Sequence, residues 1–292
     1  MSQATPKTRD VQHPAHQGHR ALRFWRPDPL WYHPPLCALV VRLSQLVMQG
    51  LNSVTFEGRE RWDALFGEAG ASWSREGGRG LLSVSNHVSL FDDPLLISNL
   101  GATSYADVRW IAADHKNFFG SNLKGLIFSA GKCVPLIRGD GLDQPGFDFL
   151  RERLKEGDWV HLFPEGGRTR REAGLLKRPL KVGVGRLIYE ASPVVMPFYH
   201  YGMHEVMPVG AVLPRRGHHV KVRFGSSSVI DDSWWVARYA DEGLDTSREP
   251  MDERASWAVA TRWVERQLLE LERQVNPLAT DASITSTHTS NT

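Results

Sequence analysis

Residues 81–96 read LLSVSNHVSLFDDPLL: an apolar run, a polar turn and a second apolar run. A short apolar run bounded by turn residues is typical of a buried strand, which we predict at the start of this stretch. Asp93 followed by Pro94 has the pattern of a helix N-cap with proline at the first helical position, which predicts a helix from there. His87 and Asp92 would then lie in the turn between strand and helix.

Strand-like and helix-like stretches alternate along the rest of the chain. The strand-like runs are residues 81–85, 108–112, 134–137, 159–163, 194–199 and 220–224. Helix-like stretches lie between several of them, notably residues 143–156 and 177–191. Such alternation predicts an α/β sheet with crossover helices. Apolar residues at three- and four-residue spacing over 257–275 predict a last amphipathic helix, capped by Asp252 and followed by Pro277.

The composition is that of an ordinary globular protein. The chain has 292 residues, of which 41 % are hydrophobic, so its length allows one large α/β domain or two small ones. Lys and Arg total 35 and Asp and Glu 33, and a formal net charge of only +2 argues against a dedicated nucleic-acid binder. The two cysteines, Cys37 and Cys133, are too few for a disulfide framework and fit a reducing compartment or packing roles.

The charges are unevenly spread along the chain. Residues 1–26 carry five basic groups against one acidic group, and residues 166–187 carry seven against one. Residues 231–253 carry eight acidic groups against two basic ones. These clusters predict one surface that attracts anions and another that repels them, unless the charges are simply scattered over solvated faces.

Residues 36–56 form the most apolar stretch of the chain and follow a segment rich in Trp and Pro. On a helical wheel Arg42, Gln45, Gln49 and Asn52 fall within about 80° of one another, and the remaining circumference is mostly Leu, Val and Met. A spanning helix needs roughly 20 apolar residues and a central Arg costs about 3 kcal/mol, which favours a helix lying in the membrane interface over one that crosses. The alternative is a buried core helix with one polar stripe.

These observations divide the chain into four parts. We predict a disordered tail over residues 1–24, a membrane-anchoring segment over 25–56, one folded domain over 57–276 and a second disordered tail over 277–292. Both tails are polar, and the second is rich in Ser and Thr with almost nothing to bury.

His87 and Asp92 are the first candidates for chemistry. Residues five apart on a regular helix point about 140° away from each other, but in a turn at the end of a strand they can meet. A carboxylate beside a histidine fixes its tautomer and leaves the other ring nitrogen to accept a proton, so the pair could activate a hydroxyl nucleophile. An H-x₄-D spacing also arises easily by chance. In that alternative Asp92 and Asp93 both cap the helix, and His87 is an ordinary loop histidine.

A second strand-like run, over residues 134–137, closes with Arg138-Gly139. An arginine at the carboxyl edge of a strand in an α/β sheet stands where such folds bind ligands, and its fork suits phosphate. The alternative is an ordinary exit from a strand, with Arg138 solvated.

The run over residues 159–163 closes with Pro164 and then Glu165-Gly166-Gly167-Arg168. Glu165 could accept hydrogen bonds from a polar substrate, and Arg168 could bind phosphate. Gly166 and Gly167 permit close backbone approach or a positive φ. Four more basic residues follow and could line the same anionic site: Lys177, Arg178, Lys181 and Arg186.

Several common motifs are missing. The chain has no GxSxG, the nucleophile turn of many serine hydrolases. The glycines before Lys132 are spaced one residue too far apart for a phosphate-binding loop. His200 and His204 have metal-ligand spacing, but proline and glycine residues interrupt the helix that would align them, and no third ligand is obvious. We therefore predict neither a metal nor another cofactor.

Taken together, the candidate blocks resemble the glycerolipid acyltransferase superfamily. Its hallmark is an Asn-His-x₄-Asp block, an arginine-bearing strand end, a Glu-Gly turn and a hydrophobic strand with a proline, in that order. Here the blocks lie at residues 86–92, 134–139, 163–166 and 194–197. Finer matches at GKCVP (131–135), GDWVHLFPEG (157–166) and KVGVGRLI (181–188) are similar to the branch that transacylates phospholipids. The resemblance covers residues 30–275, and the combination is highly specific although each fragment alone is not.

The resemblance implies a mixed, mostly parallel central sheet flanked by helices, with an N-terminal membrane-associated helix. It implies an enzyme that moves fatty acyl groups between phospholipids and lysophospholipids without CoA, as in cardiolipin and phospholipid remodelling. By position, His87 would be the general base and Asp92 its orienting partner. The substrate would be bound by Arg138, Gly139, Glu165, Gly166, Arg168 and Lys181.

The resemblance also implies the partners. They would be the two lipid substrates and a membrane surface, held by monotopic or peripheral attachment, with no cofactor and no nucleic acid. The membrane would be a bacterial cytoplasmic membrane or a mitochondrial one.

Two departures keep the acyl donor open. The turn after Glu165 continues as Gly166-Gly167-Arg168, closer to the Glu-Gly-x-Arg turn of lysophosphatidic-acid acyltransferases, and the insert after Arg138 is short. An acyl-CoA-dependent lysophospholipid acyltransferase is therefore the alternative. A hydrolase that passes the acyl group to water and a non-catalytic lipid-binding protein are further alternatives, although an intact His87 argues against the last.

Overall fold

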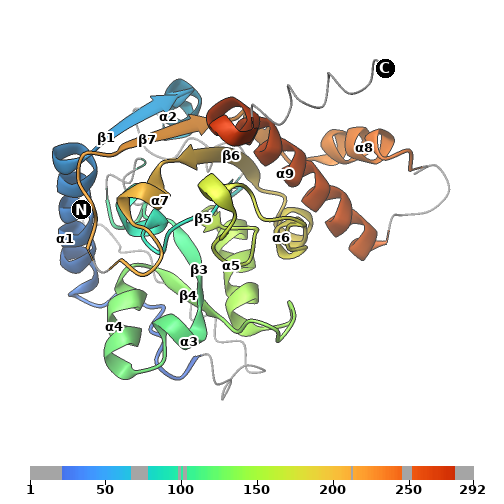
Figure 1. The fold of residues 1–292 in the computed structure, drawn as a ribbon. Coiled ribbons are helices and arrows are strands. Elements are labelled where there is room, and N and C mark those ends of the chain that lie inside the picture. The colour runs from blue at the N-terminus through green and yellow to red at the C-terminus, as the bar shows by residue number, and fades with distance from the viewer. Residues whose placement is uncertain are drawn as a thin grey trace, which may run out of the picture.

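A computed structural model describes residues 22–66, 78–97, 100, 104–211, 213–244 and 252–279. Its described strands form one eight-stranded sheet in the order β1-β7-β6-β2-β5-β3-β4, with β8 pairing with β6 (Figure 1). The strands are β1 (Ser53–Glu57), β2 (Leu81–Val84), β3 (Trp110–Asp114), β4 (Cys133–Leu136), β5 (Trp159–Leu162), β6 (Val194–Tyr201), β7 (His219–Phe224) and β8 (Ser228–Val229). Only the pairings of β6 with β7 and β8 are antiparallel. The mixed, mostly parallel sheet expected from the sequence is confirmed.

Helices cover both faces of this sheet. The longer ones are α1 (His33–Gln45), α2 (Arg59–Phe66), α4 (Asn122–Ala130), α5 (Pro145–Lys155), α6 (Gly183–Ala191), α8 (Asp232–Asp241) and α9 (Glu253–Val275). The shorter ones are η3 (Leu46–Leu51), η4 (Asp92–Leu96), α3 (His115–Phe118), η6 (Glu172–Gly174) and α7 (Met203–Val206).

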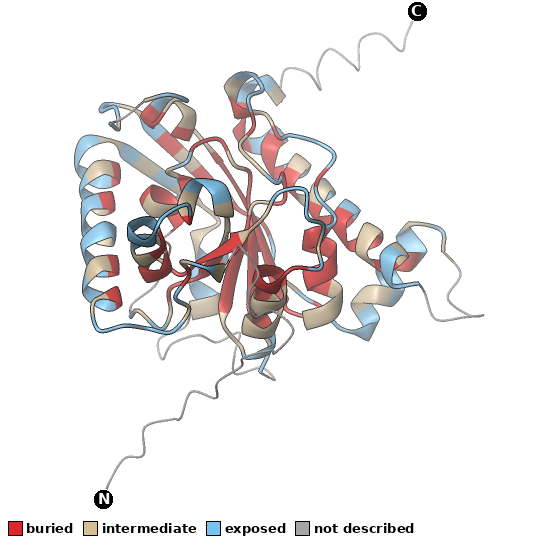
Figure 2. Ribbon diagram, turned by 90° about the horizontal axis from the view of Figure 1, so that it is seen from below, coloured by how far each residue is buried: buried red, intermediate tan, exposed pale blue. Residues whose placement is uncertain are grey.

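The side chains of each central strand alternate between two hydrophobic cores. Leu82 and Val84 of β2 join a core with α5, α6 and α9, whereas Leu81 joins a core with η3, α2 and η4. Since successive residues of a strand point to opposite faces, one apolar run fills both cores. Every residue of β2 and β5 is buried, as expected for parallel strands covered on both sides (Figure 2).

The predicted strands and the last helix are confirmed, with end shifts of one or two residues. Asp252 caps α9 as predicted, because its side chain accepts the backbone N–H of Ala255. The predicted cap at Asp93 is wrong. The helix η4 begins at Asp92 with Phe91 in the cap position, and Asp93 instead pairs with the buried guanidinium of Arg109.

The apolar N-terminal stretch folds as a helix only up to residue 51. One continuous helix, long and apolar enough to cross a membrane, runs through α1 and η3 over His33–Leu51. Asn52 ends it: its side-chain amide donates to the carbonyls of Val47 and Arg215 and its oxygen accepts the N–H of His218. Ser53–Glu57 then forms β1 beside β7, so the helical interpretation of residues 52–56 is wrong.

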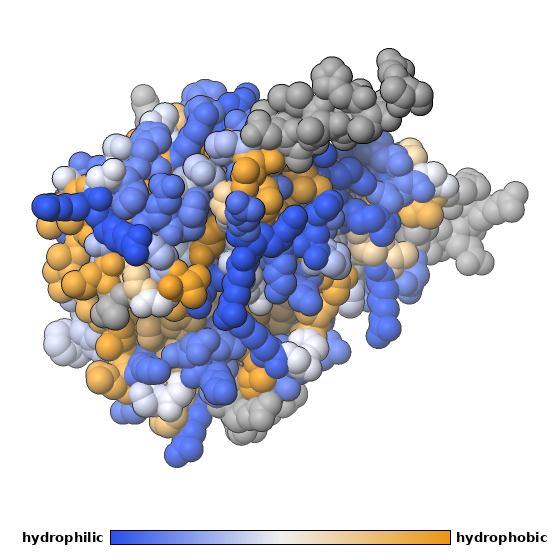
Figure 3. Space-filling view, viewed as in Figure 1, coloured by the Kyte–Doolittle hydropathy of each residue, from blue (hydrophilic) through white to orange (hydrophobic). Residues whose placement is uncertain are grey.

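Two faces of α1 have different surroundings. Cys37 and Ser44 are buried against the domain, whereas Leu39 and Leu43 are more than half exposed on the opposite side. Hydrophobic side chains accordingly gather along the left edge of the molecule in Figure 3. The predicted disordered tails lie outside the described residues, apart from residues 22–24 and 277–279.

Candidate active site

His87 and Asp92 meet in the turn between β2 and η4. The Nδ1 atom of His87 lies 2.9 Å from Oδ2 of Asp92. The same oxygen accepts the backbone N–H groups of Val88 and Ser89 at 2.7 and 2.9 Å. A single carboxylate oxygen therefore shapes the turn and orients the imidazole.

The carboxylate of Asp92 is fully buried. Burial alone would raise the pKa of Asp92, but the imidazoles of His200 and His87 and the N–H of Ser89 outweigh it and hold that pKa below its usual value. As a carboxylate, Asp92 is thus suited to stabilise a positive charge on His87.

Neighbouring residues fix both the backbone and the ring of His87. Its carbonyl accepts the N–H of Thr169 at 2.7 Å, and its ring stacks on Phe163 with 4.0 Å between ring centres. The side chain stays 14 % exposed. Because Nδ1 faces Asp92, Nε2 is the ring nitrogen left to exchange a proton with a substrate.

The carboxyl group of Glu165 contacts the backbone of His87. Its Oε1 accepts the backbone N–H of His87 at 2.6 Å, and its Oε2 accepts that of Lys177 at 2.7 Å. Glu165 is fully buried, and burial raises its pKa to about 8 despite these two bonds. Both oxygens accept from this chain's own backbone, so Glu165 positions the His87 turn in this structure, and its contact with substrate stays a prediction.

Asn86 ties the histidine turn to β6. Its side-chain amide donates to the carbonyl of His200, and its side-chain oxygen accepts the backbone N–H of His200, both at 2.9 Å. The ring Nε2 of His200 lies 3.1 Å from the carbonyl oxygen of Asn86 and 3.7 Å from Asp92. Burial lowers the pKa of His200, although the charge of Asp92 and the bond to Asn86 oppose this shift.

A third buried imidazole supports the strand ends. Nδ1 of His161 lies 2.8 Å from the hydroxyl of Ser83, and burial lowers the pKa of His161 well below its usual value. His161 and His200 could not be predicted as parts of this site from the sequence, because their contacts lie across the sheet. Only their position on apolar strands could have indicated that they are buried and neutral.

The Gly166-Gly167 turn lies between two cations. Gly167 faces Arg138, because a Cβ on Gly167 would lie 3.5 Å from the Arg138 guanidinium. Gly166 has a φ of +68°, and a Cβ there would lie 2.8 Å from Cγ of Lys181. The structure thus brings Arg138 and Lys181, predicted from separate blocks, to one turn that follows directly on Glu165.

Arg138 is the more accessible of these cations. Its side chain is 63 % exposed and its Nε lies 3.3 Å from Asp114, so the guanidinium is anchored at one end and open at the other. Gly139 follows with a φ of +91°, a conformation that favours glycine.

The other basic residues of this region differ in their freedom. Arg168 is half-buried and makes no side-chain hydrogen bond or ion pair with the part of the chain that is described. Arg178 is half exposed, near Glu265. Arg186 is nearly buried and bonded to Glu190 and Asp143, so the expectation that it lines an anionic site is corrected.

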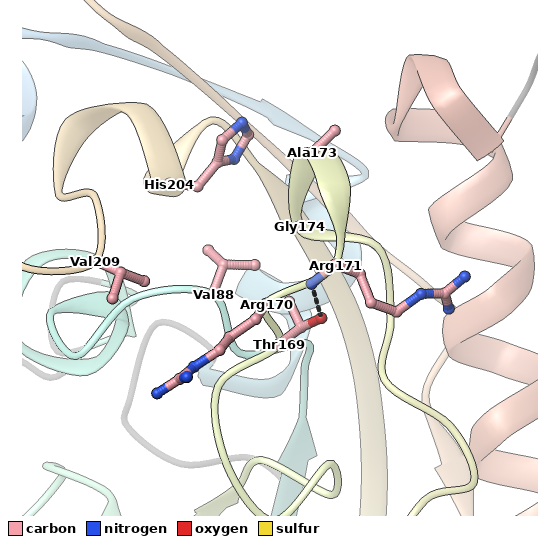
Figure 4. A pocket seen from close by; sticks show the side chains of 8 residues that line it. All are labelled: Val88, Thr169, Arg170, Arg171, Ala173, Gly174, His204 and Val209. Carbon is pink, nitrogen blue, oxygen red and sulfur yellow. Dashed lines mark hydrogen bonds between the residues drawn. The ribbon is translucent and has the colours of Figure 1, made fainter.

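A cavity of about 410 Å³ lies beside the histidine turn (Figure 4). It is lined by Val88, Thr169, Arg170, Arg171, Ala173, Gly174, His204 and Val209. Val88 and Thr169 are the residues that follow and brace His87, so the cavity adjoins the dyad. Arg171 points away from it toward α9 and donates to the carbonyl of Leu176 (Figure 4).

The arrangement suits general-base chemistry on an anionic substrate. An imidazole oriented by a buried carboxylate stands near accessible cations, and the described residues contain no group of three or more His, Cys, Asp or Glu side chains that could hold a metal ion.

Comparisons with known proteins agree with this chemistry. The family model for acyltransferases matches residues 53–201. Tafazzin of Drosophila melanogaster is 31 % identical over 260 residues, covering 86 % of this chain and 66 % of that protein. The taffazin of Dictyostelium discoideum is 34 % identical, over 56 % of this chain and 59 % of that one. An N-acylphosphatidylethanolamine synthase of Arabidopsis thaliana is 34 % identical, over 64 % and 69 %.

The chain spans 59 to 66 % of the length of the two tafazzins. Among solved structures, a 1-acyl-sn-glycerophosphate acyltransferase from Thermotoga maritima aligns with 81 % of this chain and 80 % of its own. That alignment has 18 % identity and a TM-score of 0.48.

Proposed function

The chain belongs to the acyltransferase family, within the glycerolipid acyltransferase superfamily, and on this premise we propose that it moves fatty acyl groups between phospholipids and lysophospholipids. The observation that carries the proposal is the 2.9 Å contact between His87 and the buried carboxylate of Asp92. The likeness to tafazzins from two organisms supports phospholipids as the substrate class.

In the proposed reaction His87 acts as general base. The hydroxyl of a lysophospholipid donates a hydrogen bond to Nε2 and transfers its proton as its oxygen attacks the ester carbonyl of a donor lipid. Asp92 stabilises the imidazolium that forms. The same proton then passes to the departing oxygen as the tetrahedral intermediate collapses, which releases a new lysophospholipid. A positioned base of this kind contributes roughly 10²- to 10⁴-fold to the rate.

The cations beside the glycine turn bind the lipid phosphate in this proposal. Arg138 offers a planar fork for bidentate contact and Lys181 a point charge, while Arg168 is a third donor within the same turn. Gly166 and Gly139 leave the backbone open for close approach.

The N-terminal helix carries the membrane association in this proposal. Only 11 % of its apolar window is buried in the protein, yet Cys37, Ser44 and Met48 on one side contact the domain. A helix with one face on the protein and the other exposed suits an interfacial position better than a crossing one. We place the protein at a bacterial cytoplasmic or a mitochondrial membrane.

Acyl transfer without CoA is tested with two lipids. The protein is incubated with a labelled diacyl phospholipid and an unlabelled lysophospholipid, with and without acyl-CoA. We expect the labelled acyl group to move only when both lipids are present. The rate of this transfer should be the same with and without acyl-CoA. Release of free thiol with acyl-CoA, and no transfer without it, would instead support the CoA-dependent reaction that the Glu165–Arg168 turn also suggests. Free fatty acid without an acceptor would indicate a hydrolase.

A further inference from the structure

Helix α4 exposes aliphatic side chains that the site described above does not use. Leu123 is 68 % exposed and Ile127 is 44 % exposed, and residues four apart lie on one face of a helix. The opposite face is packed: a Cβ on Gly125 would lie 2.0 Å from the carbonyl oxygen of Phe24. The outward face of α4 is therefore apolar, while its inward face packs closely against the chain at Phe24.

This face continues the exposed face of the N-terminal helix. The two helices are in contact, and the backbone N–H of Arg26 bonds to Ser129 of α4, which ties the entry of α1 to this helix. On α1 and η3, three leucines at helical spacing are more than half exposed: Leu39, Leu43 and Leu46. Trp31, at 88 % exposure, precedes α1. Figure 3 shows hydrophobic side chains along this edge, over α1 and α4.

The helices of this edge carry charges of one sign, although the exposed Asp28 lies in the segment before α1. α1, η3, α3 and α4 contain no Asp or Glu at all, and their cations are Arg42, Lys116 and Lys124. At the opposite end of the molecule, α8 has Asp231 and Asp232 at its start (Figure 1). At its end, Asp241 pairs with Arg238, and Glu242 pairs with Arg262 and Arg266. An apolar strip on helices that carry cations and no carboxylate of their own matches a bilayer whose headgroups are anionic.

We propose that α4 is a second membrane contact. Leu123 and Ile127 enter the same leaflet as the outer side of α1, Lys124 lies at the headgroups, and the acidic end at α8 points away from the bilayer. This inference rests on the proposed action on membrane lipids and adds the surface and the orientation. The occupant is a lipid surface, because a second copy would bring like charges, from Arg42, Lys116 and Lys124, face to face.

The test compares two matched substitutions. Leu123→Glu places a charge on the proposed face, and Val236→Glu does the same on α8, where Val236 is 61 % exposed. Flotation with phosphatidylcholine vesicles containing phosphatidylglycerol should show about a 10-fold loss of partitioning for Leu123→Glu. Val236→Glu should partition as the wild-type protein does. Wild-type binding should also fall with salt.

Equal partitioning of Leu123→Glu and wild type would overturn the proposal, as would a shift of Leu123→Glu from dimer to monomer with vesicle binding unchanged. A second measurement keeps the proposal testable if Leu123→Glu does not fold. When vesicles are added, the emission maximum of a fluorophore attached to Leu123→Cys should shift to shorter wavelength. The emission of the same fluorophore on Val236→Cys should not shift. The reverse result would reject the proposed orientation. The native cysteines are buried.

Acyl transfer in detergent–lipid micelles separates this inference from the proposed function. Leu123→Glu should keep wild-type transfer in micelles, where no bilayer must be reached. A wild-type protein that floats as expected but transfers no acyl group would reject the function and leave the docking face standing.

Discussion

At the scale of single residues, two carboxylates of the site have opposite electrostatic situations. The imidazoles and N–H groups around Asp92 hold its pKa below the usual value, whereas burial raises the pKa of Glu165 to about 8. Asp92 is therefore suited to stabilise a cation, and Glu165 to brace a backbone. The separation of tasks follows from what each carboxylate touches.

The raised pKa of Glu165 predicts a pH-dependent stability. The native state holds this proton up to about pH 8, while the unfolded chain releases it near pH 4.5, so the contribution of Glu165 is fully present below about pH 4.5 and is lost as the pH rises through 8. Relative to Glu165→Gln, the wild-type free energy of unfolding should fall by at most about 1.4 kcal/mol per pH unit in this window. Denaturant melts of both proteins at pH 5, 6.5 and 8 measure it, and parallel curves would contradict the assignment.

Asn86 offers a test of the link to β6. Asn86→Ala removes both side-chain bonds to the backbone of His200, which should cost about 1–3 kcal/mol of stability and leave His87 less well oriented. We expect kcat to fall with little change in KM, because substrate binding depends on other residues. A change confined to KM would mean that Asn86 acts on substrate instead.

At the scale of elements, much of the fold could be predicted from apolar runs. All six predicted strands are present. The clearest are β2, β5 and β6, which are mostly apolar segments buried on both faces of the sheet. The strand β1 was not predicted, because Val54 and Phe56 extend the apolar stretch of the preceding helix past the polar residues within 49–53. Only the side chain of Asn52, bonded to residues over 160 positions away, ends that helix.

The candidate site was predictable where its partners are local. The proximity of His87 and Asp92 follows from a turn in which only four residues separate them. Other features depend on contacts between distant segments, which the sequence does not display. These are the burial of Glu165, the contact of Arg186 with Asp143 and the pairing of Asp93 with Arg109.

The glycine turn predicts a difference between two similar substitutions. Gly166→Ala and Gly141→Ala both place a Cβ at a positive φ, at a cost of about 1–2 kcal/mol each. Only the Cβ at residue 166 meets a neighbour, Lys181, within 4 Å. Gly166→Ala should therefore also raise KM for phospholipid several-fold, as measured by initial rates over lipid concentration. Equal KM values for the two variants would argue against a role for Lys181 in binding.

The contact of α6 with α9 is a second element-scale test. A Cβ on Gly185 would lie 1.9 Å from the carbonyl oxygen of Trp257, a backbone atom that cannot swing aside. Gly185→Ala should lower the free energy of unfolding by about 3 kcal/mol or more, by analogy with overpacked cores. Gly131→Ala, whose nearest neighbour would be at 3.6 Å, is the control and should unfold almost as the wild type does. A near-neutral Gly185→Ala would mean that the helices can move apart at little cost.

At the scale of the whole molecule, one sheet brings the proposed chemistry and the proposed lipid contact together. The histidine turn, the Arg138 strand end and the Glu165 turn all follow parallel strands, so they meet at the carboxyl edge of the sheet. The apolar helix α1 contacts η4, the element that carries Asp92. A base fixed within a domain that also exposes an apolar helix is suited to substrates that never leave the membrane.

The most direct test is the rate of acyl transfer between labelled lipids, in the absence of CoA, by the wild type, His87→Ala, Asp92→Asn and the exposed-site control Asp63→Asn. We expect the first two variants to fall to roughly one hundredth of the wild-type rate or less while circular dichroism shows the native fold, and Asp63→Asn to be unchanged. Wild-type transfer by both His87→Ala and Asp92→Asn would contradict this expectation.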